Sequence, residues 1–125
     1  MDPVKVWQEG SKDALDTAQK LYASKKYNHA LFFLHLAIEK ILKAIYTHKN
    51  NVATPYVHNL VLLAEKAEIK TTTDEKKQLA EITEFNVSTR YEDYKYRMYK
   101  KATPKYAQKW LEIGKGFLKK FTKEL

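Results

Sequence analysis

The sequence predicts an all-α fold, an up-and-down bundle of about five helices that forms a single domain over residues 1–125. Three observations lead to this prediction. Apolar residues recur at the three- and four-residue spacing of amphipathic helices along most of the chain. Only three glycines and three prolines interrupt it. The stretch from Leu31 to Tyr46 is apolar almost all round, which is typical of the central helix of a bundle.

The first helix is expected from Pro3 to Ala23. Asp2 can cap its first turn, and proline is favoured at the first helical position because it lacks the backbone N–H that would be unpaired there. The second helix contains the apolar stretch, and the segment "NNVATPYV" ends it. These two helices should form the centre of the bundle.

Each of the later helices has its own start signal. Thr54 and Pro55 predict the beginning of a third helix. Thr72 and Glu75 have the spacing of a capping box and predict a fourth. Thr103-Pro104 predicts the last helix, whose apolar stripe includes Trp110 and Phe117.

The stretch "NVSTRYEDYKYRMYKKA", from Asn86 to Ala102, fits no period well. A helix would place Tyr91, Tyr94 and Met98 together but would direct Tyr96 and Tyr99 elsewhere. We therefore expect an irregular connection here, which can include one helical turn. Its tyrosines and cations are compatible with two roles. They can bind a single-stranded nucleic acid, with the rings stacking on bases and the cations holding phosphates, or the tyrosines can pack against a helical core.

Positive charge is concentrated in the last third of the chain. The net charge is +8, and residues 90–125 carry 11 Lys and Arg against 4 Asp and Glu, an excess of +7. This predicts a surface that binds RNA, a nucleotide or another anion, and the alternative is a solvated lysine surface. The residues proposed for anion binding are Lys95, Tyr96, Arg97, Tyr99, Lys100, Lys101, Lys105 and Lys109.

The second helix carries one polar stripe across its apolar surface: His35, Glu39 and Lys43 at four-residue spacing, with Lys40 beside them. Glu39 ahead of Lys43 is the favourable order for an ion pair within a helix. We call this predicted set the polar seam. It either lines a groove or dimer interface, or is a structural ion pair at the edge of the bundle. His58 either caps the third helix or points into the seam.

The sequence contains no recognisable cofactor or metal motif. Gly10, Gly114 and Gly116 match no phosphate-binding loop, so no cofactor is expected. His35 and Glu39 could begin a metal site, but no second pair of matching spacing stands out, and no metal is expected. The absence of cysteine, of an apolar leader and of any long apolar run predicts a cytoplasmic protein without a membrane span.

Three stretches in order, "HALFFLHLAIEKILKAIY", "HNL" and "RYEDY", resemble the motifs of the HEPN family of small prokaryotic helical domains. The resemblance implies a HEPN-like four- or five-helix bundle that forms a homodimer. It also implies a minimal nucleotidyltransferase as partner, in a toxin–antitoxin-like module. It further implies that Arg90, Tyr91 and Asp93 join the polar seam, locking the turn after the fourth helix against Glu39, Lys43 and His58.

Many members of that family are metal-independent ribonucleases with an arginine four to six residues before a histidine. Here Arg90 and Arg97, the only arginines, both follow His58, the last of four histidines. The sequence therefore predicts a non-catalytic or weakly catalytic protein that binds nucleotide or RNA, or a nucleotidyltransferase partner. The alternative is a ribonuclease toxin with a rearranged site, in which His58 or His35 meets Arg90.

Overall fold

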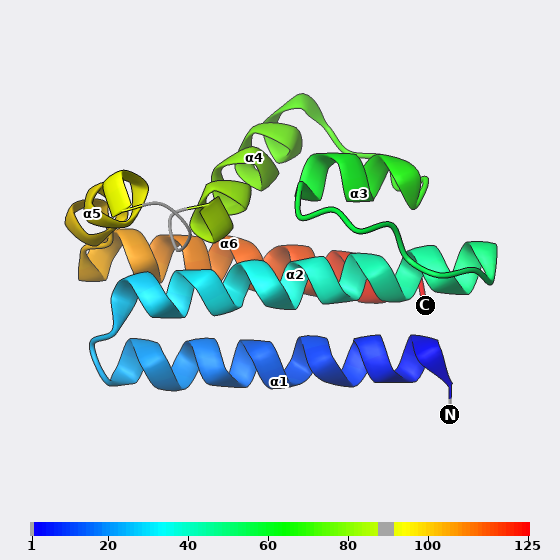
Figure 1. The fold of residues 1–125 in the computed structure, drawn as a ribbon, viewed down its shortest axis with the longest axis horizontal. Coiled ribbons are helices and arrows are strands. Elements are labelled where there is room, and N and C mark those ends of the chain that lie inside the picture. Colours follow the sequence, from blue (N-terminus) through cyan, green and yellow to red (C-terminus); the bar gives the residue numbers. More distant parts are fainter. Residues whose placement is uncertain (1, 88–91) are drawn as a thin grey trace.

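The computed structural model describes residues 2–87 and 92–125, with the backbone alone for residues 87 and 92–95. These residues form six helices and no strand, which confirms the all-α prediction (Figure 1). The helices are α1 (Pro3–Ala23), α2 (Tyr27–Asn50), α3 (Leu60–Lys66), α4 (Thr73–Val87), α5 (Glu92–Lys101) and α6 (Pro104–Thr122).

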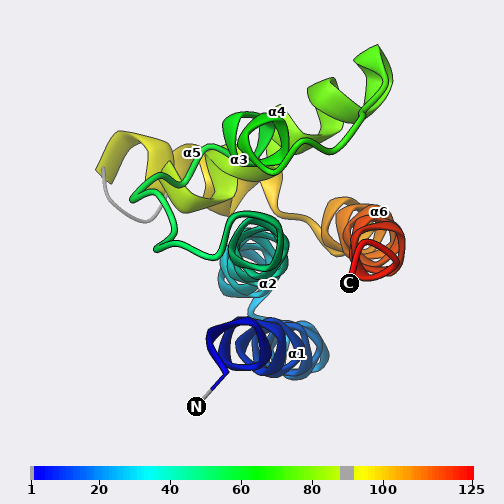
Figure 2. The ribbon, with the colours of Figure 1, turned by 90° about the vertical axis from the view of Figure 1, so that its right-hand side faces the viewer.

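Helix α2 is the centre of the molecule. Viewed along the long helices, α1 packs on one side of α2, α3 and α4 lie on the other, and α6 lies alongside (Figure 2). Leu34, Ile38, Leu42 and Ile45 of α2 are fully buried. Each such side chain stabilises the fold by about 1.5–3 kcal/mol through burial of apolar surface. The neighbouring helices of the same chain bury most of the apolar residues of α2.

Several helices begin at the predicted caps. The side chain of Asp2 accepts a hydrogen bond from the backbone N–H of Val4, and α1 spans the predicted residues. Thr72 and Glu75 bond each other's backbone N–H groups, at 2.9 and 3.1 Å, as a capping box does. Thr103 caps α6. Each of these caps joins residues within one helical turn, so its hydrogen bonds do not depend on how the helices pack.

The predicted start of the third helix is wrong. Thr54 and Pro55 lie in an irregular segment, and α3 begins five residues after Pro55, where the side chain of Asn59 accepts from the N–H of Leu62. Proline suits the first helical position but does not by itself start a helix, and here the first cap with a hydrogen bond to a backbone N–H is Asn59. This segment carries His58 across α2 toward α3.

The predicted irregular connection is also wrong in part, because residues 92–101 form α5. We did not expect a helix because it would direct Tyr96 and Tyr99 away from its apolar face. In the structure the two tyrosines do point away from that face and are exposed, whereas Met98 and Ala102 are buried. The two aromatic residues belong to the surface, so their positions do not count against a helix.

Helices α2 and α6 approach closely at Gly114. A Cβ atom at this position would lie 2.4 Å from Cδ1 of Leu34, so only glycine fits. Within residues 2–87 and 92–125, no helix has the length and apolar character needed to cross a membrane.

Candidate functional site

Glu39 of α2 organises a buried polar cluster. It is only 5% exposed, and its Oε2 accepts from Nζ of Lys43 at 3.2 Å. Its Oε1 accepts from Nδ1–H of His58 at 2.7 Å. Nε2 of His35 lies 3.9 Å from the same Oε1. We call Glu39, Lys43, His35 and His58 the Glu39 cluster. The structure thus brings together four members of the predicted polar seam.

His35 is neutral and its tautomer is defined. Its Nε2 lies 2.9 Å from the carbonyl oxygen of His58, and a carbonyl only accepts, so Nε2 carries the proton. The side chain is completely buried, and this burial lowers the pKa of His35 below its usual value. His35 therefore holds the backbone of the α2–α3 connection in place and is closed to solvent.

Lys43 and Lys40 take different directions. Lys43 is 6% exposed, and its Nζ lies 5.3 Å from the centroid of the Trp7 ring, so a cation–π contact supplements the Glu39 pair. The Lys40 side chain lies instead across α1, where a Cβ at Gly10 would be 3.1 Å from its Cδ. Lys40 is thus packed against α1.

The side chains of three predicted seam residues lie outside what the structure describes. Arg90 and Tyr91 fall in residues 88–91, and Asp93 is described by its backbone only. The predicted partner of Glu39 was Lys43 or Arg90: the structure shows the pair with Lys43, and a contact with Arg90 stays a prediction.

His58 is the member of the Glu39 cluster that solvent reaches, with a side chain 29% exposed. Because Nδ1–H donates to Glu39, the neutral ring keeps Nε2 as an acceptor. Tyr56 is 92% exposed. Its ring meets the His58 ring edge-on, with 5.7 Å between the two ring centroids. A carboxylate that orients a histidine in this way is the arrangement a general base requires.

The α5 helix presents aromatic rings and cations to solvent. Tyr96 and Tyr99 are 61% and 71% exposed, and Nζ of Lys100 lies 4.7 Å from the centroid of the Tyr96 ring. Arg97 and Lys105 are also exposed. We call Tyr96, Arg97, Tyr99 and Lys100 of α5, together with Lys105 in the first turn of α6, the α5 surface. Residues three apart on a helix are neighbours, so the two tyrosines lie side by side.

Two further cations proposed for anion binding contact side chains of α4 and α6. Lys101 forms a 2.6 Å ion pair with Glu81 of α4 and lies over the Tyr106 ring. Lys109 lies over Trp110. The side chain of Lys95 lies outside the described residues. The eight residues proposed for anion binding therefore have different surroundings, and we do not expect them to contribute equally to binding.

Glu81 and Tyr106 were not singled out by the sequence. The Tyr106 hydroxyl donates to Glu81. Burial, and then this hydrogen bond, raise the pKa of Tyr106 well above its usual value. Burial alone would raise the pKa of Glu81, but the bonds from Lys101 and Tyr106 outweigh it and hold the pKa below its usual value. The two residues come from α4 and α6, so no sequence spacing links them.

Among the side chains that the structure describes, those of residues 2–86 and 96–125, no group of three or more His, Asp or Glu could hold a metal ion.

Comparisons with known proteins agree on the fold. The family model described as "HEPN domain" matches residues 4–125. The crystal structure of TT1696 from Thermus thermophilus superposes with a TM-score of 0.85 at 19% identity, and the match covers 100% of both chains. At this identity the likeness establishes the fold alone. Among curated proteins, none matches this chain in sequence.

Proposed function

Because the chain belongs to the HEPN domain family, we propose that it is a member that binds single-stranded RNA through the α5 surface without cleaving it efficiently. The observation that carries this proposal is the exposure of Tyr96 and Tyr99, side by side on one helix among cations. Tyrosines that stand in solvent are available to bases, because every base has a face on which a ring can stack.

Charge supplies the rest of the proposed binding. Lysines hold phosphates as point charges and carry little information about base sequence, so binding should depend on salt and tolerate many sequences. Lys100 lies over Tyr96 and so joins a cation to a stacking ring. Lys101 contributes less, because its Nζ is bound to Glu81.

The Glu39 cluster supports binding without efficient cleavage. His35 is completely buried and cannot reach a substrate, and Lys43 is engaged by Glu39 and Trp7. No arginine precedes a histidine in the sequence, so the arginine–histidine motif of the family's ribonucleases is absent.

Labelled oligouridine tests this proposal in a binding titration and, in parallel, on a cleavage gel. Tyr96→Leu with Tyr99→Leu should weaken binding by about 1–3 kcal/mol for each base that stacks, roughly 5- to 150-fold. Tyr56→Leu is the control, because it removes a tyrosine that is still more exposed and lies outside the α5 surface. If both variants bind as the wild type does, the tyrosines are not a stacking platform.

Charge is tested separately. Arg97→Gln with Lys100→Gln should flatten the dependence of the logarithm of affinity on the logarithm of salt concentration, by about 0.7 for each phosphate that is no longer neutralised. Lys76→Gln with Lys77→Gln removes two exposed positive charges from α4 and should leave the slope unchanged. An equal effect in both variants would assign binding to net charge alone.

A ribonuclease with a rearranged site is the second candidate, and one observation favours it. His58 is oriented by Glu39, its side chain is 29% exposed, and Nε2 is left as an acceptor, as in a general base. Wild-type protein that cleaves oligouridine, with cleavage abolished in His58→Asn, would establish this candidate in place of the first.

Family membership also motivates a protein partner, a minimal nucleotidyltransferase in a toxin–antitoxin-like module. We propose that such an enzyme, where it is encoded beside this chain, forms a complex with it. Co-expression followed by size-exclusion chromatography tests this, and separate elution of the two proteins would contradict it.

A further inference from the structure

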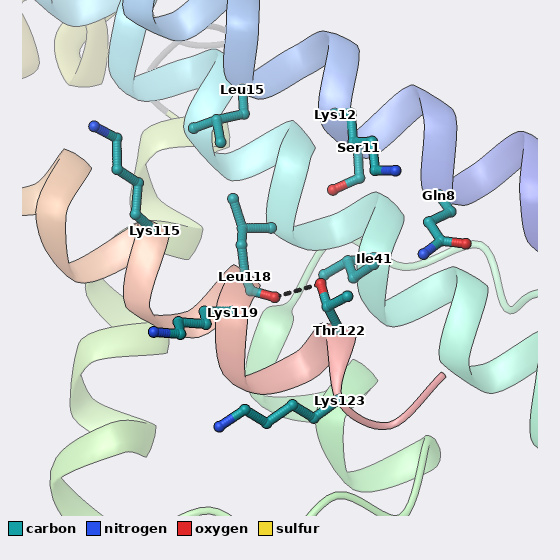
Figure 3. Close-up of a pocket in the computed structure, with 10 residues that line it drawn as sticks. All are labelled: Gln8, Ser11, Lys12, Leu15, Ile41, Lys115, Leu118, Lys119, Thr122 and Lys123. Atoms are coloured by element: carbon teal, nitrogen blue, oxygen red, sulfur yellow. Dashed lines mark hydrogen bonds between the residues drawn. The ribbon is translucent and has the colours of Figure 1, made fainter.

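A groove opens between α1 and α6, with α2 as its floor (Figures 2 and 3). Its volume is about 460 Å³. The floor is aliphatic: Ile41 of α2 is buried, while Leu15 of α1 and Leu118 of α6 are half-buried. Of the described residues that line it, none is aromatic. The groove therefore offers apolar contact and no surface on which a base would stack.

Hydroxyl groups in the groove are already satisfied. Thr122 donates to the carbonyl of Leu118 at 2.6 Å, as Figure 3 shows. Ser11 donates to the carbonyl of Ala37 at 2.7 Å. Apart from the Gln8 amide and the lysine ammonium groups, the lining side chains offer few hydrogen-bond partners, so shape and charge select the occupant.

The rim of the groove is basic. Lys115 and Lys119 of α6 and Lys123, the residue that caps its end, follow one another at four-residue intervals, and Lys12 lies on the α1 side. Lys12, Lys119 and Lys123 are exposed, whereas Lys115 lies 3.5 Å from Glu112. Four residues of helix advance about 6 Å, so the row repeats at the spacing at which a second helix presents its own i and i+4 side chains. Among the lining residues that the structure describes, none is acidic.

We propose that this groove binds an acidic amphipathic helix of a partner protein. The apolar face of that helix would lie on Leu15, Ile41 and Leu118, and its flanking carboxylates would meet the lysines of both walls. The walls run about 10–12 Å, two helical turns. An incoming helix would complete a four-helix arrangement with α1, α2 and α6, a helix-in-groove mode of recognition.

Charge and shape disfavour the other occupants. A second copy of this chain that met the groove face to face would bring lysines against lysines. Single-stranded RNA would find cations but no aromatic ring. A fatty acid carries one anionic group at one end, whereas the four lysines are spread along the whole groove.

The test uses the full chain and a synthetic peptide of about 18 residues, long enough to form a helix. The peptide has leucines along one face and glutamates on both flanks, and a scrambled peptide of the same composition is its control. Fluorescence anisotropy should give binding of the designed peptide at least about tenfold tighter than that of the scrambled one. Backbone amide shifts should change at Lys12, Leu15 and Lys119.

Matched charge reversals locate the site. Lys119→Glu with Lys123→Glu should weaken peptide binding at least about tenfold, because like charges would then face each other. Lys76→Glu with Lys77→Glu makes the same change on α4 and should leave binding within about twofold. Circular dichroism checks that both variants are folded.

Four outcomes would overturn the proposal. They are equal binding of the scrambled peptide, equal weakening in the α4 variant, no binding to the wild type, and groove shifts caused by oligouridine or laurate but not by the peptide. A mass that falls from dimer to monomer on Lys119→Glu would also overturn it, because the groove would then join two copies of this chain.

Discussion

Removal of the Glu39 carboxylate should strongly destabilise the protein. Glu39→Ala leaves the cation of Lys43, 6% exposed, without its carboxylate, and His58 loses its acceptor. Breaking a buried pair from one side costs about 3–5 kcal/mol, because the remaining charge is buried without compensation. For a domain of this length that corresponds to a fall in melting temperature of roughly 10–20 °C.

Thermal melts followed by circular dichroism at neutral pH measure this effect. Asp16→Ala is the matched control, since it removes a carboxylate that also pairs with a lysine four residues later, but in an exposed pair. The control should melt within about 2 °C of the wild type, because surface pairs contribute little.

A double variant separates the cost of the unpaired buried charge from that of the missing ion pair. Replacing both partners, Glu39→Leu with Lys43→Met, removes both charges and should recover most of the stability that Glu39→Ala removes. A Glu39→Ala protein that melts within about 2 °C of the wild type would refute the reasoning, since the pair would then be solvated in solution.

Three further predictions concern packing, pH and assembly. Gly114→Ala should lower the free energy of unfolding by about 1–3 kcal/mol, because the new Cβ would meet Leu34. Gly116→Ala should raise it by about 0.5–1 kcal/mol, because a Cβ there has no atom within 4 Å and alanine favours a helix more than glycine does. Urea denaturation compares the two variants. The pKa of His35 is lowered by burial, so the unfolded chain binds a proton more readily; stability is full above the usual pKa of 6.5 and falls as the pH drops through and below it. His35→Leu should flatten this dependence, and an unchanged curve in urea melts from pH 8 to 5 would contradict it. The chain should be a homodimer, as its family membership suggests, and light scattering that gives a mass near 14.7 kDa would show a monomer instead.

Helix boundaries were predictable where the signal is local. Asp2 and Thr103 cap their helices through bonds to backbone N–H groups two or three residues away, and Thr72 with Glu75 does the same. Such bonds form within one turn of chain, so the sequence specifies them by itself. The apolar pattern of α2 likewise specified a central helix, and the three motif stretches indicated the family.

The boundaries that failed depended on distant contacts. Residues 92–101 form a helix although Tyr96 and Tyr99 are exposed, and the chain here meets the core through Met98 of α5 and Ala102, which follows it. The sequence shows that a residue is apolar or aromatic, but the packing of neighbouring helices determines whether its side chain is buried or exposed.

The candidate sites were determined by the tertiary structure. The sequence placed Glu39 and Lys43 one turn apart, and their pairing followed from that spacing. It left open whether His58, 19 residues further on, would cap a helix or join them, and the path of the α2–α3 connection decided it. The groove between α1 and α6 joins residues more than 100 positions apart, so no spacing could reveal it. Local hydrogen bonds are encoded in adjacent residues, whereas a site built from several helices exists only after those helices have packed.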